Sequence, residues 1–276
     1  MTDHPRPRGG VTLTLRAVAV SPEIQLGDVD ANFDSIRSAV RTAADGGAQL
    51  IVLPELATCG YMFADRPEAE DAAVTRDDSR WAAIQEVLPT EAVVVIGYGE
   101  AAGRELYNTA AVLTCDRRLA DYRKSHLWGP ETQIFDRGTT AGMIVDAPFG
   151  RLGIAICYDN EFPEVPRRLA RAGADVLAVP VNWPLVPRPS GEHPPELIQA
   201  MAAARSSRLP TVIADRHGEE RGITWTAGTA IVDELGWVIA RGADAARGAT
   251  LALDAARDKS LPPYNDLFAD RRPELY

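Results

Sequence analysis

The chain has few cysteines and histidines for its length. Its 276 residues include three cysteines and four histidines, and no C-x-x-C pair occurs. An odd, small number of cysteines argues against a disulfide scaffold and a thiol redox protein, and a zinc ribbon would lack ligands. We therefore expect no metal site and a reducing, cytoplasmic setting.

Long apolar runs and basic stretches are also missing. No apolar run approaches the roughly 20 residues that cross a bilayer, so no membrane association is expected. The formal net charge is −10 and no basic stripe is visible, which argues against a nucleic-acid partner. The polar, proline- and glycine-rich residues 1–10 predict a flexible tail and lack the apolar region of a signal peptide.

Segments typical of strands and helices alternate along the rest of the chain, in which 46 % of residues are hydrophobic. The expected helices cover 31–44, 163–173 and 196–206. The expected strands cover 11–20, 49–55, 92–100, 108–114, 118–124, 150–159, 175–182, 210–215, 229–234 and 237–242. This alternation predicts an α/β fold in a single domain spanning residues 1–276.

Two stretches of the chain look alike. A helix ending at Gly47 precedes QLIVLPE, and a helix ending at Gly173 precedes DVLAVPVNWP. Common α/β patterns could produce this echo by chance, but we favour two similar halves whose sheets pack face to face with helices outside. Such halves would place Glu55 and Asn182 at matching strand ends, where α/β sheets collect their sites.

Cys157 is the best candidate for a nucleophile. It ends an apolar run and precedes a helix expected near Pro163, and backbone N–H groups at such a turn can stabilise a thiolate or an oxyanion. A buried structural cysteine is the alternative. The pKa of a free thiol is about 8.5, so catalysis near neutral pH would need a base or a cation nearby. Cys59 could lie near a site because it follows Glu55, whereas Cys115 is expected in a hairpin turn.

Three charged residues could supply that help. Glu55 ends an apolar run, where burial would raise its pKa and make it a better base, although it could instead cap the next loop. Lys124 could be a solvated charge, or a buried cation that donates to an oxyanion. Glu131 could likewise be a solvent-facing loop acid. A pair of Cys157 with His126 is the weaker interpretation, because the other histidines lie in polar loops.

These segments together resemble the nitrilase superfamily of carbon–nitrogen hydrolases. LPELATCGY, YRKSHLWGPE and CYDNEFPE are similar to the family's glutamate, lysine and cysteine motifs, and they occur in the family's order. GYGE, YNTA, NWP and the closing YNDLFADRRPELY also look like family segments, so the resemblance covers nearly the whole chain.

The resemblance implies a fold and a set of roles. The fold is a four-layer α-β-β-α sandwich, usually dimerised into a longer stack. Glu55 would be the general base, Lys124 the oxyanion stabiliser and Cys157 the nucleophile. Glu131 matches the family's second glutamate, and the Tyr158 N–H would complete the oxyanion hole. The expected partners are an amide substrate and further copies of this chain, with no cofactor; residues 262–276 would be a loose tail or an arm on a partner subunit.

The residues after Cys157 favour an amidase within the family. Nitrilases usually continue with Trp-Glu, whereas Tyr158-Asp159 is similar to amidases and carbamoyl hydrolases. We predict hydrolysis of a small, aliphatic carboxylic amide to acid and ammonia. An N-carbamoyl hydrolase, a dicarboxylic monoamide amidase, a nitrilase and an inactive binding or scaffold protein stay open as alternatives.

Aromatic and amide side chains beside the motifs are the candidate pocket walls. They are Tyr61, Trp128, Phe162, Asn182 and Trp183. One departure from the family pattern is Asp215-Arg216, where many relatives carry Asn-Arg. The family pattern therefore does not predict the hydrogen bonds that Asp215 forms.

Overall fold

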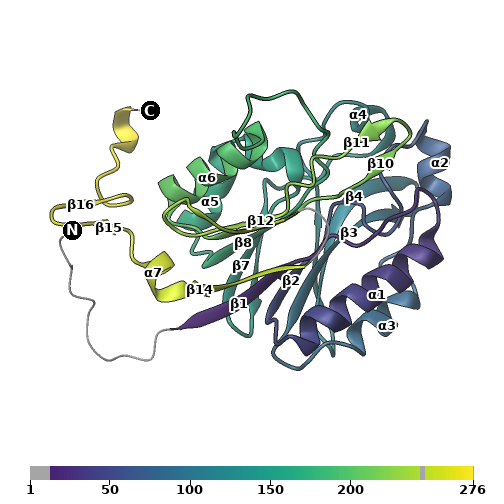
Figure 1. Cartoon of the computed structure of the whole chain (residues 1–276), viewed down its shortest axis with the longest axis horizontal. Helices are drawn as coiled ribbons and strands as arrows, with labels where there is room; N and C mark the ends of the chain where they lie inside the picture. Colours follow the sequence, from purple (N-terminus) through teal and green to yellow (C-terminus); the bar gives the residue numbers. More distant parts are fainter. Residues whose placement is uncertain (1–12, 243–245, 276) are drawn as a thin grey trace.

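The computed structural model describes residues 13–242 and 246–275, so the tail predicted at 1–10 lies outside the described residues (Figure 1). Two six-stranded sheets lie face to face, and helices cover their outer sides. The predicted four-layer α-β-β-α sandwich is therefore confirmed.

The first sheet is built mainly from the first half of the chain. Its strands, in spatial order, are β14 (Arg247–Ala252), β1 (Thr14–Ala19), β2 (Leu50–Val52), β3 (Val93–Ala102), β4 (Glu105–Leu113) and β5 (Arg118–Arg123). β1, β2 and β3 are parallel, and the other neighbours pair antiparallel. The helices of this half are α1 (Val29–Asp45), α2 (Arg66–Asp71), α3 (Arg80–Gln85) and α4 (Glu131–Ile134).

The second half builds the second sheet with the same plan. Its strands, in spatial order, are β13 (Val238–Arg241), β12 (Ala230–Val232), β9 (Thr211–Ala214), β8 (Val176–Pro180), β7 (Gly150–Ile154) and β6 (Met143–Ala147). Parallel strands β7, β8 and β9 form its centre. The larger helices α5 (Glu164–Arg171) and α6 (Pro195–Ser207) cover its outer face (Figure 1).

Short elements complete the chain. They are the 3-10 helices η1 (Cys157–Glu161) and η2 (Pro273–Leu275), helix α7 (Leu253–Arg257), and the two-stranded ribbons β10 (Glu219–Glu220) with β11 (Ile223–Thr224) and β15 (Ser260–Leu261) with β16 (Asn265–Asp266). Among the helices of the described residues, none combines the length and the apolar character needed to cross a bilayer.

The central strands are buried on both faces. In β2, Leu50 and Val52 pack in the core between the sheets, while Ile51 packs with Phe33 and Ile36 of α1 on the outer face. Successive side chains of a strand point to opposite faces, so a strand covered on both sides carries a continuous apolar run. This explains why QLIVLPE shows no polar alternation.

Several predicted strands are shorter than expected, and two of them end before Glu55 and Cys157. β2 ends at Val52, and Pro54 has no N–H with which to continue the ladder to Glu55. β7 ends at Ile154, not at Asp159, because the Asp159 side chain accepts the Ile156 N–H at 2.9 Å and starts η1. The chain therefore turns out of each sheet just before Glu55 and Cys157.

The sequence prediction missed β14. This strand pairs antiparallel with β1, with Thr14 opposite Ala252, and so returns the C-terminal part of the chain to the first sheet. Beyond α7 the chain leaves the two sheets (Figure 1). This C-terminal segment contacts helix α5 through Arg167, which donates to the Leu267 carbonyl at 2.5 Å and lies over the Phe268 ring. The arm predicted at 262–276 stays a prediction.

Candidate active site

Three charged side chains meet in the interior. Glu55 follows β2, Lys124 follows β5, and Glu131 begins α4. The Lys124 Nζ lies 2.6 Å from Oε1 of Glu55 and 2.8 Å from both carboxylate oxygens of Glu131. The exposed fractions of the three residues are 0 %, 0 % and 3 %. We call this group the Lys124 cluster; its burial rules out a solvated lysine and a solvent-facing Glu131.

Burial and mutual attraction set the protonation of the cluster. Burial raises the pKa of Glu55 to about 7, with the Lys124 charge opposing this shift and the Glu131 charge adding to it. Burial alone would lower the pKa of Lys124, but the carboxylates of Glu131 and Glu55 outweigh it and raise that pKa well above its ordinary value. Lys124 therefore keeps its charge at neutral pH, while Glu55 can gain and lose a proton there.

The two oxygens of Glu55 are held differently. Oε1 accepts from Lys124 and from the Asn108 Nδ2 at 2.8 Å. Oε2 is buried and has no hydrogen-bond partner among the described residues. A buried polar atom without a partner is costly, and it is the oxygen at which this carboxylate can take up a proton.

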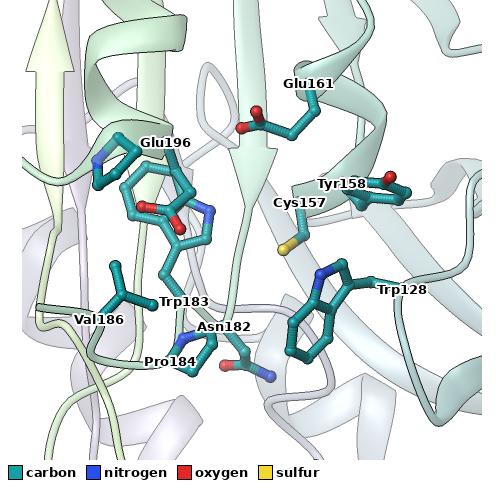
Figure 2. A pocket seen from close by; sticks show the side chains of 10 residues that line it. Trp128, Cys157, Tyr158, Glu161, Asn182, Trp183, Pro184, Val186 and Glu196 are labelled. Atoms are coloured by element: carbon teal, nitrogen blue, oxygen red, sulfur yellow. The ribbon is translucent and has the colours of Figure 1, made fainter.

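Cys157 begins η1 and lines a cavity of about 200 Å³ (Figure 2). Its φ of +46° lies in the left-handed region, which costs a non-glycine residue roughly 1–2 kcal/mol. Burial and then the Glu55 charge raise the pKa of the Cys157 thiol well above its ordinary value, against the Lys124 charge and the backbone N–H of Asn182. The sulfur therefore keeps its proton until a base removes it.

The predicted pocket residues divide between two adjoining cavities. Trp128, Tyr158, Asn182 and Trp183 line the first cavity with Cys157. Tyr61 and Glu131 line a second, mostly apolar cavity of about 260 Å³. Trp128 also lines that second cavity, so the two spaces meet at its side chain.

Asn182 joins the two halves of the fold. Its Nδ2 donates to the backbone carbonyl of Glu55 at 2.9 Å, so the two residues predicted at matching strand ends are in contact. The Tyr61 hydroxyl donates to the Glu131 carboxylate, and so does the backbone N–H of Trp128, at 3.1 Å. The two halves therefore meet at the Lys124 cluster, whose Glu131 lies in the wall of the second cavity. Within the described ranges, no three His, Cys, Asp or Glu side chains are grouped so that they could hold a metal ion.

The sequence model of the carbon–nitrogen hydrolases matches residues 15–258, which is most of the chain. The chain belongs to the carbon–nitrogen hydrolase family. It is therefore a hydrolase of carbon–nitrogen bonds, in the nitrilase superfamily, as its motifs predicted.

Known carbon–nitrogen hydrolases match this chain over nearly their whole length. A nitrilase from Pyrococcus abyssi is 33 % identical, over 94 % of this chain and 97 % of its own. An N-carbamoylputrescine amidase from Arabidopsis thaliana is 29 % identical, over 90 % of each chain. A structure of an amidase from Nesterenkonia sp. AN1 superposes with a TM-score of 0.76 at 25 % identity, over 95 % of this chain and 98 % of that chain.

Some predicted residues of this carbon–nitrogen hydrolase lie outside the cavity walls. Phe162 stacks on the His126 ring, with centroids 4.1 Å apart, and meets Tyr158 edge-on, so it supports the wall from behind. His126 Nδ1 lies 2.7 Å from Asp159, which argues against its pairing with Cys157. Cys59 is 1 % exposed, and burial raises the pKa of its thiol to about 12.

The Asp215-Arg216 departure has a defined set of hydrogen bonds. Oδ1 of Asp215 accepts from the backbone N–H groups of Trp183 at 2.9 Å and Arg216 at 2.8 Å, and Oδ2 accepts from Gly228 at 2.7 Å. Burial raises the pKa of Asp215 to about 7, while these donors favour the carboxylate. A Cβ at Gly228 would lie 2.9 Å from the Trp183 ring, so this close approach requires glycine.

Arg216 extends this network to the first half of the molecule. It forms a buried ion pair with Glu220, whose Oε1 accepts the N–H groups of Tyr61 at 2.8 Å and Met62 at 2.6 Å. We call Asp215, Arg216 and Glu220 the Asp215 cluster. Sequence reasoning missed this role, and it missed Asn108, although the YNTA segment that contains Asn108 had been noted.

Proposed function

We propose that this carbon–nitrogen hydrolase converts small, aliphatic carboxylic amides to acid and ammonia through a thioester on Cys157. One observation carries the proposal: Asn182 links Cys157, which lines a cavity, to the buried Lys124 cluster, because its backbone N–H faces the thiol and its side chain donates to the Glu55 carbonyl. The charges of Glu55 and Lys124 both act on the Cys157 thiol, which requires the three groups to be close together.

The first half of the reaction would form the thioester. Glu55 takes the proton of the thiol, and the sulfur attacks the amide carbon, so that a C–S bond forms and an electron pair moves to the carbonyl oxygen. Lys124 and the Tyr158 N–H donate to this oxyanion, and one such donor is typically worth about 3 kcal/mol. Glu131 holds Lys124 in place through both carboxylate oxygens.

The second half would release the products. Glu55 returns its proton to the amide nitrogen, the C–N bond breaks, and ammonia leaves. Glu55 then takes a proton from water, whose oxygen attacks the thioester. The C–S bond breaks, Glu55 returns this proton to the Cys157 sulfur, and the acid departs. An amide and a water thus become an acid and ammonia. A structure of a mutant of the Nesterenkonia amidase supports a reactive cysteine, since it shows the Michael addition of acrylamide at the active-site cysteine.

An N-carbamoyl compound is the second candidate substrate. The match to the Arabidopsis N-carbamoylputrescine amidase favours it. The chemistry at Cys157 would be the same, but hydrolysis of a carbamoyl group also releases carbon dioxide. Product analysis therefore separates the two candidates.

Ammonia release across a panel of aliphatic amides, nitriles, N-carbamoyl compounds and dicarboxylic monoamides tests the proposal. Aliphatic amides should give the highest kcat/KM. Cys157→Ala should abolish turnover and leave the unfolding temperature nearly unchanged, while the half-buried Cys115 provides the matched control Cys115→Ala, which should remain active. Turnover in Cys157→Ala at the rate of the unchanged chain would refute the mechanism. The cytoplasmic location and the homodimer stay predictions.

A further inference from the structure

Two carboxylates lie in the wall of the first cavity without a neutralising partner. Glu161 ends η1, Glu196 lies in the first turn of α6, and both line the cavity with Cys157 (Figure 2). Among the described residues, neither side chain forms an ion pair, and Oε2 of Glu196 is buried without a hydrogen-bond partner. No lysine, arginine or histidine of residues 13–242 and 246–275 lines this cavity.

A second unsatisfied acceptor belongs to the same cavity. Asn182 is 1 % exposed, and its Oδ1 has no hydrogen-bond partner among the described residues. In Figure 2, Glu161 and Asn182 lie at opposite ends of the view, with the Cys157 sulfur between them. A molecule bound in front of that sulfur therefore meets acceptors on several sides and benefits from donating hydrogen bonds.

The charges of the wall favour a cation. Burial and the Glu196 charge raise the pKa of Glu161, so the two carboxylates repel each other. A positive group between them would relieve this repulsion and form charge-assisted hydrogen bonds. The aromatic rings of Trp128 and Trp183 in the same wall can also attract a cation through their faces.

We infer that the first cavity selects amides whose far end carries a positively charged nitrogen, with Glu196 and Glu161 as the residues that determine this specificity. The inference rests on the proposed function and names its substrate class. The same wall would disfavour amides that end in a carboxylate. Glu196 should contribute more than Glu161, because Glu161 is the more exposed of the two and solvent weakens its attraction.

Three amides of matched size test the inference. 4-Aminobutanamide ends in an ammonium, pentanamide ends in a methyl group, and succinamate ends in a carboxylate. We expect kcat/KM for 4-aminobutanamide to exceed that for pentanamide about tenfold, as one charge-assisted contact allows, with succinamate lowest. The inference would be overturned if kcat/KM for the ammonium amide were equal to or lower than that for the methyl-ended amide. The same must hold when both chains are shortened or lengthened by one carbon.

Single substitutions assign the preference to its residues. Glu196→Gln should bring the ratio of the two kcat/KM values close to one, and Glu161→Gln should lower it by a smaller factor. Glu192→Gln is the matched control, because it removes one charge from the exposed loop before α6, outside the cavity wall. The control should leave the ratio within twofold. An unchanged ratio in Glu196→Gln, or an equal drop in Glu192→Gln, would contradict the assignment.

A second measurement separates this inference from the proposed function. If no amide is hydrolysed, the proposed function fails. The rates at which charged reagents modify Cys157 then still test whether the cavity wall attracts cations. Aminoethyl, methyl and sulfonatoethyl methanethiosulfonates place a positive, a neutral or a negative group on a thiol, and mass spectrometry locates each adduct. Glu196→Gln should slow the cationic reagent at least threefold relative to the neutral one. Equal relative rates in both chains would overturn the inference.

Discussion

The Lys124 cluster and the Asp215 cluster both hide charges from water, but they meet different neighbours. In the Lys124 cluster, one lysine faces two carboxylates, and Oε2 of Glu55 has no hydrogen-bond partner among the described residues. In the Asp215 cluster, both oxygens of Asp215 accept backbone N–H groups, and Arg216 pairs with Glu220. The first cluster retains in Oε2 of Glu55 an oxygen that can bind a proton, whereas in the second cluster Oε2 of Glu220 pairs with Arg216 and the other oxygens hold backbone segments in place.

This difference shows how one molecule can use similar residues in two ways. A buried carboxylate whose oxygens are all bonded to N–H groups is a fixed support, because moving a proton would break those bonds. A buried carboxylate with one unsatisfied oxygen beside a cysteine is suited to proton transfer. Removing groups from each cluster in turn should therefore separate chemistry from stability.

The largest effect is expected for Lys124→Met. It removes a proposed oxyanion donor and leaves Glu55 and Glu131 buried without a cation, so turnover should fall by a factor of about 100 to 1000. The free energy of unfolding should fall by about 3–5 kcal/mol. Lys259→Met is the control, since the Lys259 amine is only partly buried and donates only to backbone carbonyls. Steady-state kinetics and urea unfolding check both variants; normal turnover in Lys124→Met would place the oxyanion elsewhere.

Arg216→Met should lower the stability of the protein but leave most of its turnover, unlike Lys124→Met. It leaves Glu220 buried without its partner, so the free energy of unfolding should fall by about 3 kcal/mol. The folded enzyme should keep its chemistry, with KM raised because Glu220 holds the Tyr61 backbone, and with kcat lowered less than tenfold. Urea unfolding and kinetics below the transition measure the two effects. If kcat falls as far as in Lys124→Met, the two clusters do not differ in the way described.

The pH profile sharpens the comparison, because burial raises the pKa of Glu55 and that of Asp215 each to about 7. A base must be ionised, so kcat/KM should be lost as pH falls through about 7. Asp215→Asn should keep this acidic limb, which would assign it to Glu55. Asn108→Leu removes a donor that favours the Glu55 carboxylate and should move the limb to higher pH by up to about one unit. If the acidic limb disappears in Asp215→Asn, it belongs to Asp215, and its assignment to Glu55 is wrong.

Tyr61→Phe should give the smallest effect. Its hydroxyl donates to Glu131, while its backbone N–H, which bonds to Glu220, is unchanged by the substitution. Loss of one hydrogen bond to a carboxylate should lower kcat about three- to tenfold. Tyr98→Phe is the matched control, since this buried tyrosine donates to Asp121, outside both clusters. A larger loss in Tyr98→Phe than in Tyr61→Phe would argue against a role for Tyr61 at the site.

The central residues of the site were predictable because Glu55 and Cys157 follow apolar runs and Lys124 lies in a motif that resembles the family's. Glu55 and Cys157 follow the buried strands β2 and β7, Lys124 directly follows the partly buried β5, and the three motifs occur in the family's order. The strand ends were harder to predict, since the Asp159 side chain replaces a ladder partner and this depends on where Tyr122 places it. Apolar composition shows that a strand is buried but does not show where its hydrogen bonds stop.

Contacts between distant segments were not predictable from local patterns. The bond from Asp215 to the Trp183 N–H joins two strand ends of the second sheet, and neither segment alone indicates the other. β14 was missed for a related reason: its sequence RGATLA has a glycine and two alanines, which are weak strand formers, and its partner lies at the other end of the chain. Phe162 was assigned to the pocket because it lies near Cys157 in sequence, but η1 turns it toward His126.

The pairing of β14 with β1 has a consequence for synthesis on the ribosome. Until residue 252 has been made, β1 is an edge strand whose outer N–H and C=O groups have no partner. The first sheet is therefore completed only after the second half of the protein has been translated. A nascent chain that pauses earlier would expose this edge, and another unfinished copy on the same messenger RNA could pair with it.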